Sequence, residues 1–495
     1  MATHSSQIYQ TEQIREIELL ARQRYAIAGN EMMIRAGHAA FNFLIKRWPV
    51  TKTIAVFCGA GNNGGDGYVL AQAAHEHGVK VSIWQVGDHA KLSADARNAY
   101  EACKKAGLFI KPFDDQTNWH GANVIVDALC GIGLQGEVRK EIRYVIDLIN
   151  KSKIPVLAID VPSGINADTG AVLGAAVKAA ATITFIGMKL GLVSGTGVAY
   201  AGEVYCDDLK LPKEIFSLTQ GVLQELSLSQ FANYLKPRPR DMHKGDAGHV
   251  LIVGGDAGHS GAVRMAAQAA LRVGAGLVTV ATHPKHAAIL NATLPELMCT
   301  GVWNGRSLGP LIKKADVIVI GPGLGQSLWS KTLLKKVLAS DLPLVVDADA
   351  LNLLAKKPAT RTNWVLTPHP GEAARLLGMT NANVQADRLQ AVQQLQHRYN
   401  GVCLLKGAGT LVLAPHVAAA ICENGNPGMA TGGMGDVLSG VIAGLIAQGI
   451  PLGDAAKLGV CLHANAGDLA AREGGERGLI ATDLMPYLRK LVNPV

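Results

Sequence analysis

Paired cysteines are missing from this chain. Its eight cysteines are widely spaced, with no C-x-x-C pair and no neighbouring histidine cluster. This spacing disfavours both a disulfide framework and a zinc site, and it is typical of reduced thiols. Several cysteines stand inside apolar runs such as AVFC and VCLL, where we expect buried thiols with no catalytic role.

Long apolar runs and basic clusters are also scarce. The N-terminal segment lacks the apolar core of a signal peptide and predicts a charged amphipathic helix after Thr11. Apolar stretches elsewhere are interrupted before they reach membrane-spanning length, so we expect a cytoplasmic chain without membrane contact. The net charge of +8 comes from scattered residues that are not interleaved with aromatics, which argues against a nucleic-acid partner and favours acidic small molecules.

What the chain does have is length, apolar residues and glycine. Its 495 residues exceed what one core usually supports, and 48% are hydrophobic, so we expect two globular domains. The 56 glycines indicate many tight turns or close approaches to a ligand.

Short runs of Val, Ile and Leu alternate with helical segments in both halves, which predicts an α/β fold with parallel strands. Strand-like patterning stops over 209–248, where proline, glycine and charge gather. A short helix in LSLSQFANYLKP should open the second domain, so we expect domains at 1–224 and 225–495.

The first predicted strand, TIAVFC, is followed by GAGNNGGDGY. Gly59, Gly61 and Gly64 satisfy G-x-G-x-x-G, which alone would favour a dinucleotide-binding dehydrogenase. The inserted Asn and Asp side chains instead offer oxygen ligands to a hard cation, although such residues are also ordinary in turns.

Two later strand ends have the same character. Asp127 precedes the glycine-rich CGIGLQGE, and Asp160 precedes Ser163 in DVPSGI. Because the carboxyl ends of parallel strands meet at one edge, we expect these residues to share a crevice. Asp160 is the candidate acid or base, and Asn63, Asp127 and Ser163 are candidate ligands of a monovalent cation. The alternative is that each aspartate caps the next helix.

Together GNNGGDGY, VDALCGIG and DVPSGI make residues 10–215 resemble NAD(P)H-hydrate epimerases. The resemblance implies a Rossmann-like three-layer domain that interconverts the R and S hydrates at C6 of the nicotinamide. It also implies potassium at Asn63, Asp127 and Ser163, with Asp160 as the acid or base. The implied substrate loops comprise Asn62, Asn63, Gly64, Gly65, Asp66, Gly131, Ile132, Gly133, Leu134, Gln135, Gly136 and Glu137.

In the second half, NPGMATGGMGDVLSG predicts a glycine-rich loop that leads into an apolar helix with Asp436 in its first turn. Free amides at a helix N-terminus form an anion site. Amides near Gly432, Gly433 and Gly435 would stabilise a transferring phosphoryl group while Asp436 deprotonates the attacking hydroxyl. The alternative is an N-cap aspartate behind a flexible loop.

No G-x-x-x-x-G-K-[ST] motif occurs, so phosphoryl chemistry must rest on a scaffold other than the P-loop. The ordered set GGDxGxxGA, GPGLG, TPHPGE, KGAGT and GGMGD makes residues 230–490 resemble the ADP-dependent NAD(P)H-hydrate dehydratases, which have a ribokinase-like fold. Without that resemblance KGAGT would read as a simple hairpin.

The second resemblance implies that ADP phosphorylates the C6 hydroxyl of the S hydrate and that phosphate then leaves, with magnesium accompanying the nucleotide. The implied hydrate contacts are Ala262, Gly323, His369 and Asp436, and Asp436 is the base. The implied nucleotide contacts are Lys406, Gly407, Ala408, Gly409, Thr410 and Gly435. We expect a homo-oligomer by resemblance only.

Two alternatives remain open on the sequence. One is a small-molecule kinase of the ribokinase superfamily whose N-terminal domain binds a dinucleotide without catalysis. The other makes the N-terminal domain a module that senses a dinucleotide or a protein partner. Fusion favours repair, because the epimerase implied by the resemblance would convert the R form into the S form, which is the one that the dehydratase accepts.

Overall fold

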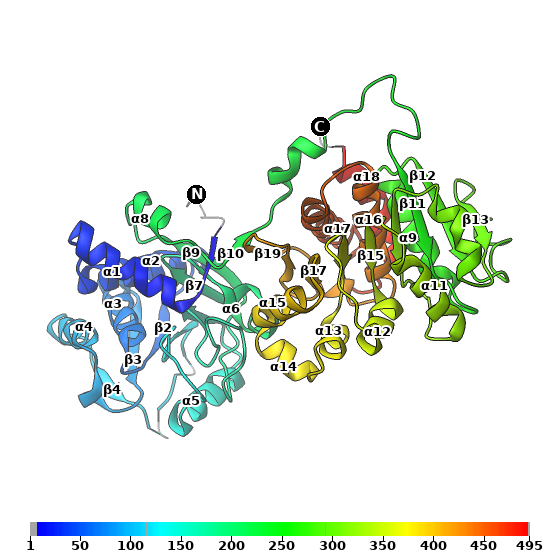
Figure 1. Ribbon diagram of the computed structural model, residues 1–495. Coiled ribbons are helices and arrows are strands. Elements are labelled where there is room, and N and C mark those ends of the chain that lie inside the picture. Colours follow the sequence, from blue (N-terminus) through cyan, green and yellow to red (C-terminus); the bar gives the residue numbers. More distant parts are fainter. Residues whose placement is uncertain (1–6, 115–116, 120, 293, 494–495) are drawn as a thin grey trace. The chain divides into compact units, whose positions relative to one another are not determined.

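The computed structural model describes residues 7–114, 117–119, 121–292 and 294–493. The chain divides into two compact units, Met1–Gln224 and Glu225–Val495, each with its own sheet and helices (Figure 1). Within the described residues, no helix is long and apolar enough to cross a membrane.

The first unit is built on a parallel sheet. Among the described residues, its strand order is β4-β3-β2-β5-β6-β7-β9. The strands are β2 (Thr53–Cys58), β3 (Lys80–Gln85), β4 (Ile110–Pro112), β5 (Val124–Ala128), β6 (Val156–Ile159), β7 (Ala181–Phe185) and β9 (Glu203–Asp207). The short strand β1 (Gln7–Tyr9) pairs antiparallel with β10 (Leu223–Glu225) and parallel with β8 (Met188–Lys189).

Helices cover both faces of this sheet, as alternation along β2 demonstrates. Ile54, Val56 and Cys58 belong to one buried core, whereas Ala55 and Phe57 belong to another. The first core is closed by α1 (Thr11–Tyr25), α2 (Gly29–Arg47), α3 (Asn62–Glu76) and α4 (Ala94–Lys105), and the second by α5 (Lys140–Lys151). The remaining helices are α6 (Leu190–Val193), α7 (Val198–Ala201) and α8 (Lys213–Leu218). Two helical layers around one sheet confirm the expected three-layer arrangement.

The second unit has a larger mixed sheet in the order β13-β12-β11-β14-β15-β16-β17-β18-β19. Pairing is parallel from β13 to β17 and antiparallel at β18 and β19. The strands are β11 (His249–Val253), β12 (Leu277–Thr282), β13 (Met298–Gly301), β14 (Val317–Ile320), β15 (Leu344–Val346), β16 (Trp364–Leu366), β17 (Val402–Leu405), β18 (Thr410–Leu413) and β19 (Ala419–Cys422).

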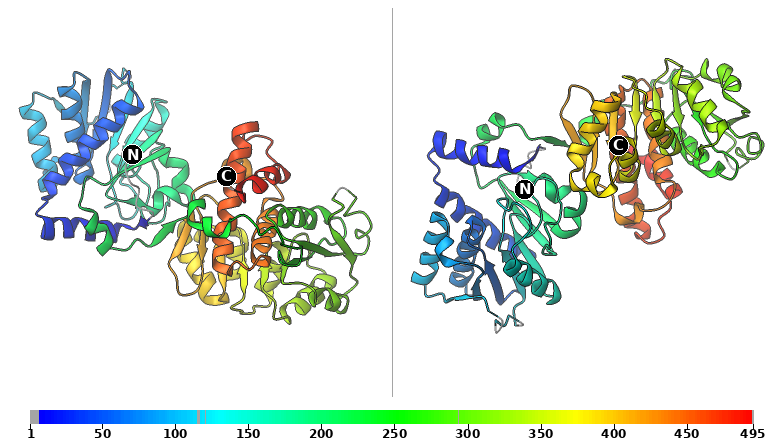
Figure 2. Two further views of the ribbon diagram at one scale, coloured as in Figure 1. Left: turned by 90° about the horizontal axis from the view of Figure 1, so that it is seen from above. Right: turned by 60° about the horizontal axis from the view of Figure 1, so that its bottom comes forward.

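Helices also flank this second sheet, as the two views in Figure 2 show. They are α9 (Ser260–Arg272), α10 (Gly309–Ile312), α11 (Leu328–Leu338), α12 (Ala348–Lys356), α13 (Pro370–Leu377), α14 (Asn381–Ala386), α15 (Arg388–Tyr399), α16 (Met434–Ala447), α17 (Leu452–Gly474) and α18 (Leu484–Leu491).

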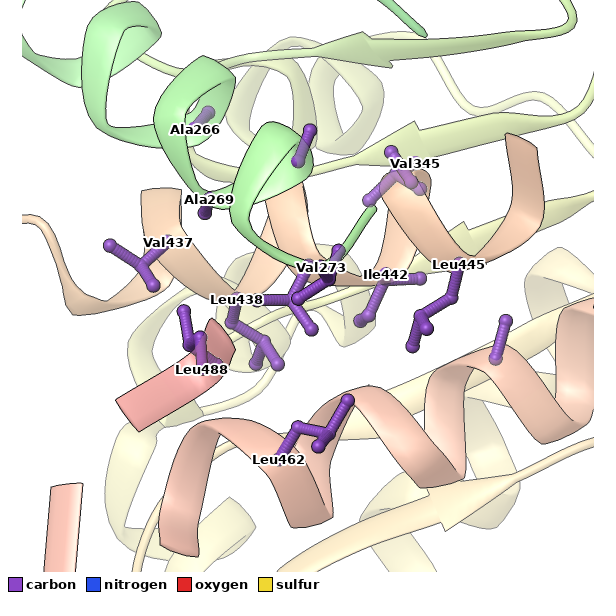
Figure 3. Close-up of a cluster of buried hydrophobic side chains, with 14 of the residues drawn as sticks. Ala266, Ala269, Val273, Val345, Val437, Leu438, Ile442, Leu445, Leu462 and Leu488 are labelled. Atoms are coloured by element: carbon purple, nitrogen blue, oxygen red, sulfur yellow. The ribbon is translucent and has the colours of Figure 1, made fainter. Parts of the chain in front are cut away.

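Helix α16 runs through the centre of the second core. Every residue from Val437 to Ile446 is buried, and Val437, Leu438 and Ile442 lie among side chains of α9, α17 and α18 (Figure 3). A side chain at Gly440 would strike the backbone of Ala266 in α9, so glycine lets the two helices approach closely. Each buried branched residue contributes about 1.5–3 kcal/mol, and this packing fixes the helix N-terminus that matters below.

Most sequence expectations for the fold are confirmed. Helix α1 begins at Thr11, Leu228–Tyr234 forms a short 3-10 helix, and six of the eight free cysteines are buried. One expectation is wrong: the segment 209–248 is not devoid of strand, because Leu223–Glu225 forms β10 against β1. Three residues are too few to give a period in the sequence.

Candidate active sites

The first site is a cavity of about 630 Å³ in the first unit. Helix α1, the N-terminus of α3, the loop after β5 and the end of β6 contribute to its walls. Among the residues expected at the substrate, its lining includes Asn62, Asn63, Asp66, Gly131, Ile132, Gly133, Leu134, Gln135, Glu137 and Asp160. The expected loops therefore meet, as the parallel topology requires.

Asp160 is held by a buried lysine. The backbone φ of Asp160 is +67°, which turns the chain sharply just after β6. Lys189, only 1% exposed, donates from Nζ to Asp160 Oδ1 at 2.7 Å and to the carbonyl of Phe185 at 2.6 Å. The carboxylate also accepts from Thr184 Oγ1 at 3.2 Å and from the Ile132 amide at 3.4 Å. Asp160 is thus a fixed, charge-paired group on the cavity wall rather than a helix cap.

Asn63 faces Asp160 across Gly131. A Cβ placed on Gly131 would lie 3.2 Å from Asn63 Cβ and 3.3 Å from Asp160 Oδ2. Asn63 is buried, and neither the oxygen nor the nitrogen of its side-chain amide has a hydrogen-bond partner in the described structure. An unpaired buried amide is costly unless a ligand satisfies it. Asn63 therefore offers an oxygen to a cation or a polar contact to a substrate.

Asp127 and Ser163 lie behind the cavity and are fully buried. Ser163 donates to Asp127 from its hydroxyl at 2.6 Å and from its amide at 2.8 Å, and the Leu129 amide adds a third bond at 3.2 Å. Burial outweighs these bonds and raises the pKa of Asp127 to about 6, so the carboxylate is ionised at neutral pH. The oxygens of Asp127 and Ser163 are thus already engaged in hydrogen bonds, which a bound cation would have to share.

Two further acids belong to this site. Burial, and then the negative charge of Asp160, raises the pKa of both Glu18 and Asp66. Asp66 belongs to the expected substrate loop, whereas sequence reasoning missed Glu18 on α1 and Lys189. Gly64, Gly65 and Gly136 are not part of the cavity lining, and Gly65 instead packs closely against Met33.

The second site lies at the N-terminus of α16. Gly433 is the N-cap with φ of +92°, which a glycine adopts without strain, so Asp436 is not the N-cap but lies in the first turn of the helix. Burial, and then the nearby Asp347, raises the pKa of Asp436 to about 7. A carboxylate poised near neutral pH at an amide-rich helix end suits a general base beside an anion.

Lys406 links this helix end to two acidic side chains, Asp347 and Glu372. Its Nζ lies 2.9 Å from Asp347 Oδ1 and 4.0 Å from Glu372 Oε2, and Ser439 donates to Asp347 Oδ2 at 2.6 Å. Burial acts to raise the pKa of Asp347, but Lys406 and Ser439 outweigh it and lower that pKa. A Cβ on Gly435 would lie 3.1 Å from Lys406 Nζ, so the ammonium group stands directly at the glycine-rich loop.

Asp347 and Ser439 were missed by sequence reasoning. Asp347 directly follows the strand residues LVV in the run LVVDAD, and an acid at a parallel strand end was the available signal. Ser439 offered none, because a serine one turn into an apolar helix is ordinary in sequence.

The expected hydrate contacts lie in the first turns of α9 and α16, in the loop after β14 and at the N-cap of α13. A Cβ on Gly323 would lie 3.2 Å from Ala262 Cβ, so these two residues adjoin. His369 caps α13, and its Nε2 lies 3.5 Å from Glu372 Oε1, which connects it to Lys406. Burial, and then the charge of Lys406, lowers the pKa of His369, so its imidazole is neutral at pH 7.

The expected nucleotide segment is the turn that joins β17 to β18, which confirms a hairpin at Lys406–Thr410. Gly407 and Gly409 have φ of +138° and +66°, and Thr410 donates from its hydroxyl to the Gly407 carbonyl at 3.0 Å. Ala408 lies between them at the exposed tip. The geometry thus joins this turn, through Lys406, to Gly435 and Asp436.

Known proteins match this chain along nearly its whole length. It is 53% identical to the bifunctional NAD(P)H-hydrate repair enzyme Nnr of Coxiella burnetii over 98% of this chain and 99% of the relative. It is 44% identical to the enzyme of the same name from Escherichia coli, over 98% and 94%. This chain belongs to the bifunctional NAD(P)H-hydrate repair enzyme family.

Two family models match separate parts of the chain, one within each unit. The NAD(P)H-hydrate dehydratase model matches residues 250–490, and the YjeF-related protein N-terminus model matches residues 29–191. Solved structures match the dehydratase part. A Streptococcus mutans protein of 32% identity covers 55% of this chain and 100% of its own, with a TM-score of 0.51. A ribokinase-like superfamily protein from Enterococcus faecalis, also 32% identical, covers 55% and 98% with a TM-score of 0.50.

Membership of the repair family confirms the family and fold class expected from the motifs. The second unit is ribokinase-like, and the first is the N-terminal domain that this family joins to it.

Proposed function

We propose that this chain repairs hydrated NADH and NADPH, with epimerisation in residues 1–224 and ADP-dependent dehydration in residues 225–495. The observation that supports the proposal most strongly is Asp436, a buried carboxyl with its pKa raised to about 7 at the helix end where Lys406 and the glycine loop meet. A chain with this second centre and the separate Asp160–Lys189 centre has what two successive reactions need.

In the second unit, Asp436 accepts the proton of the C6 hydroxyl of the S hydrate. The freed oxygen attacks the terminal phosphorus of ADP, and the bond to the AMP oxygen breaks. Amides at the start of α16 and the Lys406 ammonium stabilise the charge that develops on the phosphoryl oxygens. The C6–O bond then breaks, phosphate leaves and C5 loses a proton, so the products are NAD(P)H, AMP and phosphate.

Residue roles in the second unit follow from that chemistry. Ala262, Gly323, His369 and Asp436 would contact the hydrate, while Lys406–Thr410 and Gly435 would contact ADP. Magnesium, bound with the nucleotide, would supply charge neutralisation. The described residues contain no group of three or more His, Cys, Asp and Glu side chains arranged to hold a metal, so phosphate oxygens and water would provide most ligands.

In the first unit, Asp160 would move a proton at the hydrated nicotinamide while the Lys189 ammonium holds its carboxylate in place. Potassium at Asn63, Asp127 and Ser163 would supply a fixed positive charge beside the substrate. The loops at Asn62–Asp66 and Gly131–Glu137 would hold the dinucleotide. We further propose a cytoplasmic homo-oligomer whose ligands are small molecules, with neither nucleic acid nor membrane as a partner.

The test uses paired variants on separated R and S hydrates. Asp160→Asn should stop R/S exchange and leave ADP-dependent recovery from S unchanged. Asp436→Asn should stop recovery from S and leave R/S exchange unchanged. An equal mixture of the two variants should restore conversion of R. Loss of both activities in either variant would contradict separate sites, and a stable phosphorylated product would indicate a ribokinase-superfamily kinase instead.

A further inference from the structure

Arg388 is a buried cation that neither reaction explains. It is the first residue of α15 and is only 2% exposed, which is unusual for an arginine. Its helix contacts β17 and β18, the two strands of the hairpin that ends in the Lys406–Thr410 turn. A buried charge at this position needs a structural or functional reason.

The Arg388 guanidinium binds the inside of that turn. Its Nη2 donates to the carbonyl oxygens of Leu405 and Gly409, both at 3.1 Å. Both terminal nitrogens also lie 3.4 Å from the Lys406 carbonyl oxygen, and Nη1 reaches Gln385 Oε1 at 3.3 Å. One side chain thus fixes three carbonyls, spread over five consecutive residues.

The turn is also shaped around this guanidinium. A Cβ on Gly407 would lie 3.0 Å from Arg388 Nη1, and the φ of +138° at Gly407 is one that other residues rarely adopt. The Lys406 carbonyl held by Arg388 belongs to the residue whose ammonium group meets Asp347 and the glycine loop. Arg388 therefore controls both the turn backbone and the base of the Lys406 side chain.

We propose that Arg388 is a positioning residue that holds the Lys406–Thr410 turn in its ADP-binding conformation before the nucleotide arrives. This rests on the proposed function, in which the turn contacts ADP. A glycine-rich turn loses much conformational entropy on ordering, and ordering it in advance improves affinity for the ligand. A planar guanidinium can serve three carbonyls at once, whereas a lysine ammonium cannot reproduce that fork.

Arg361 provides a matched control in the same unit. It also binds three backbone carbonyls, those of Leu338 at 2.9 Å, Ser340 at 2.7 Å and Leu342 at 3.1 Å, but it fastens the segment before β15. Changing either arginine removes similar bonds. Only Arg388 touches the nucleotide turn.

The experiment compares Arg388→Lys and Arg361→Lys in the full chain. It measures ADP affinity directly by calorimetry, along with KM for ADP, KM for the S hydrate and kcat, and hydrogen exchange in peptides of α16 checks that the second unit is folded. Arg388→Lys should weaken ADP binding by about ten-fold or more, with KM for the hydrate changed less than about two-fold. Arg361→Lys should leave ADP affinity unchanged even where it lowers the Tm.

Guanidinium salt at non-denaturing concentration supplies a second readout. It should restore ADP affinity to Arg388→Ala and should not improve Arg361→Ala. Unchanged ADP affinity in Arg388→Lys, or an equal loss of affinity in the two lysine variants, would overturn the positioning role. Failure of the unmodified chain to bind ADP would instead refute the proposed function.

Discussion

Replacing Asp436 by asparagine should abolish dehydration and at the same time stabilise the second unit. Burial raises the pKa of Asp436 from 3.8 to about 7, a difference of about three units. At 1.36 kcal/mol for each unit, the ionised carboxylate costs the folded unit about 4 kcal/mol. Asparagine has nearly the same shape and does not ionise, so it escapes this cost.

The pH dependence gives the prediction its sign. The pKa of Asp436 is higher in the folded chain than in the unfolded chain. The stability that the protonated carboxyl contributes is therefore fully present below pH 3.8 and is lost as the pH rises to about 7. The advantage of Asp436→Asn should therefore be negligible near pH 4, grow between pH 4 and 7, and stay constant above pH 7.

The assay is urea unfolding followed by hydrogen exchange in peptides of α16, which isolates the second unit from the first. Asp341→Asn is the control, since Asp341 is an exposed aspartate in the same unit. If Asp436→Asn were no more stable than the unmodified chain at pH 8, or if its advantage did not depend on pH, the burial argument for a poised base would be refuted.

Three further predictions concern the two sites. Gly131→Ala should raise KM for the R hydrate at least ten-fold, because the new methyl would lie between Asn63 and Asp160. In the control, Gly133→Ala, the methyl projects into open space and should change KM little. Equal effects of the two changes would contradict the site geometry. Lys189→Met should lower R/S exchange more than a hundred-fold and destabilise the first unit by about 3 kcal/mol, because it leaves Asp160 as an unpaired, largely buried charge. Retention of exchange would remove the ion pair from the mechanism. For dehydration, kcat/KM should rise about ten-fold for each pH unit up to about pH 7 and then level off, since Asp436 must be ionised to act as the base. A profile in which kcat/KM falls as the pH rises through 7 would exclude Asp436 as the base.

Sequence patterns predicted the main fold because they report local burial. The apolar runs of β2, β5 and β6 are buried on both faces, and glycine or an acidic residue marks where such strands end. Strands such as β1 and β10 could not be found in the sequence, because three residues are too few to show an alternation of apolar and polar side chains. Their pairing depends on chain segments more than two hundred residues apart.

The candidate sites were predictable where a motif coincided with a strand end, as for Asp160, or with a glycine-rich helix start, as for Asp436. Lys189 and Arg388 were not predictable, because each acts through a partner that is distant in sequence, and the strand-end position of Asp347 did not reveal its pairing with Lys406. Asp347 meets Lys406 across 59 positions, and Lys189 meets Asp160 across 29. A lysine that pairs with a buried carboxylate is indistinguishable in sequence from one that lies on the surface.

The most direct test of repair by one chain follows the near-ultraviolet absorbance of reduced nicotinamide. Purified protein would be given an R/S mixture of NADH hydrate with ADP, magnesium and potassium. The account predicts that absorbance returns completely, because the first unit converts R to S as the second consumes S. Recovery that stops at the S fraction would contradict epimerisation by the first unit, and no recovery with either ADP or ATP would contradict the proposed function as a whole.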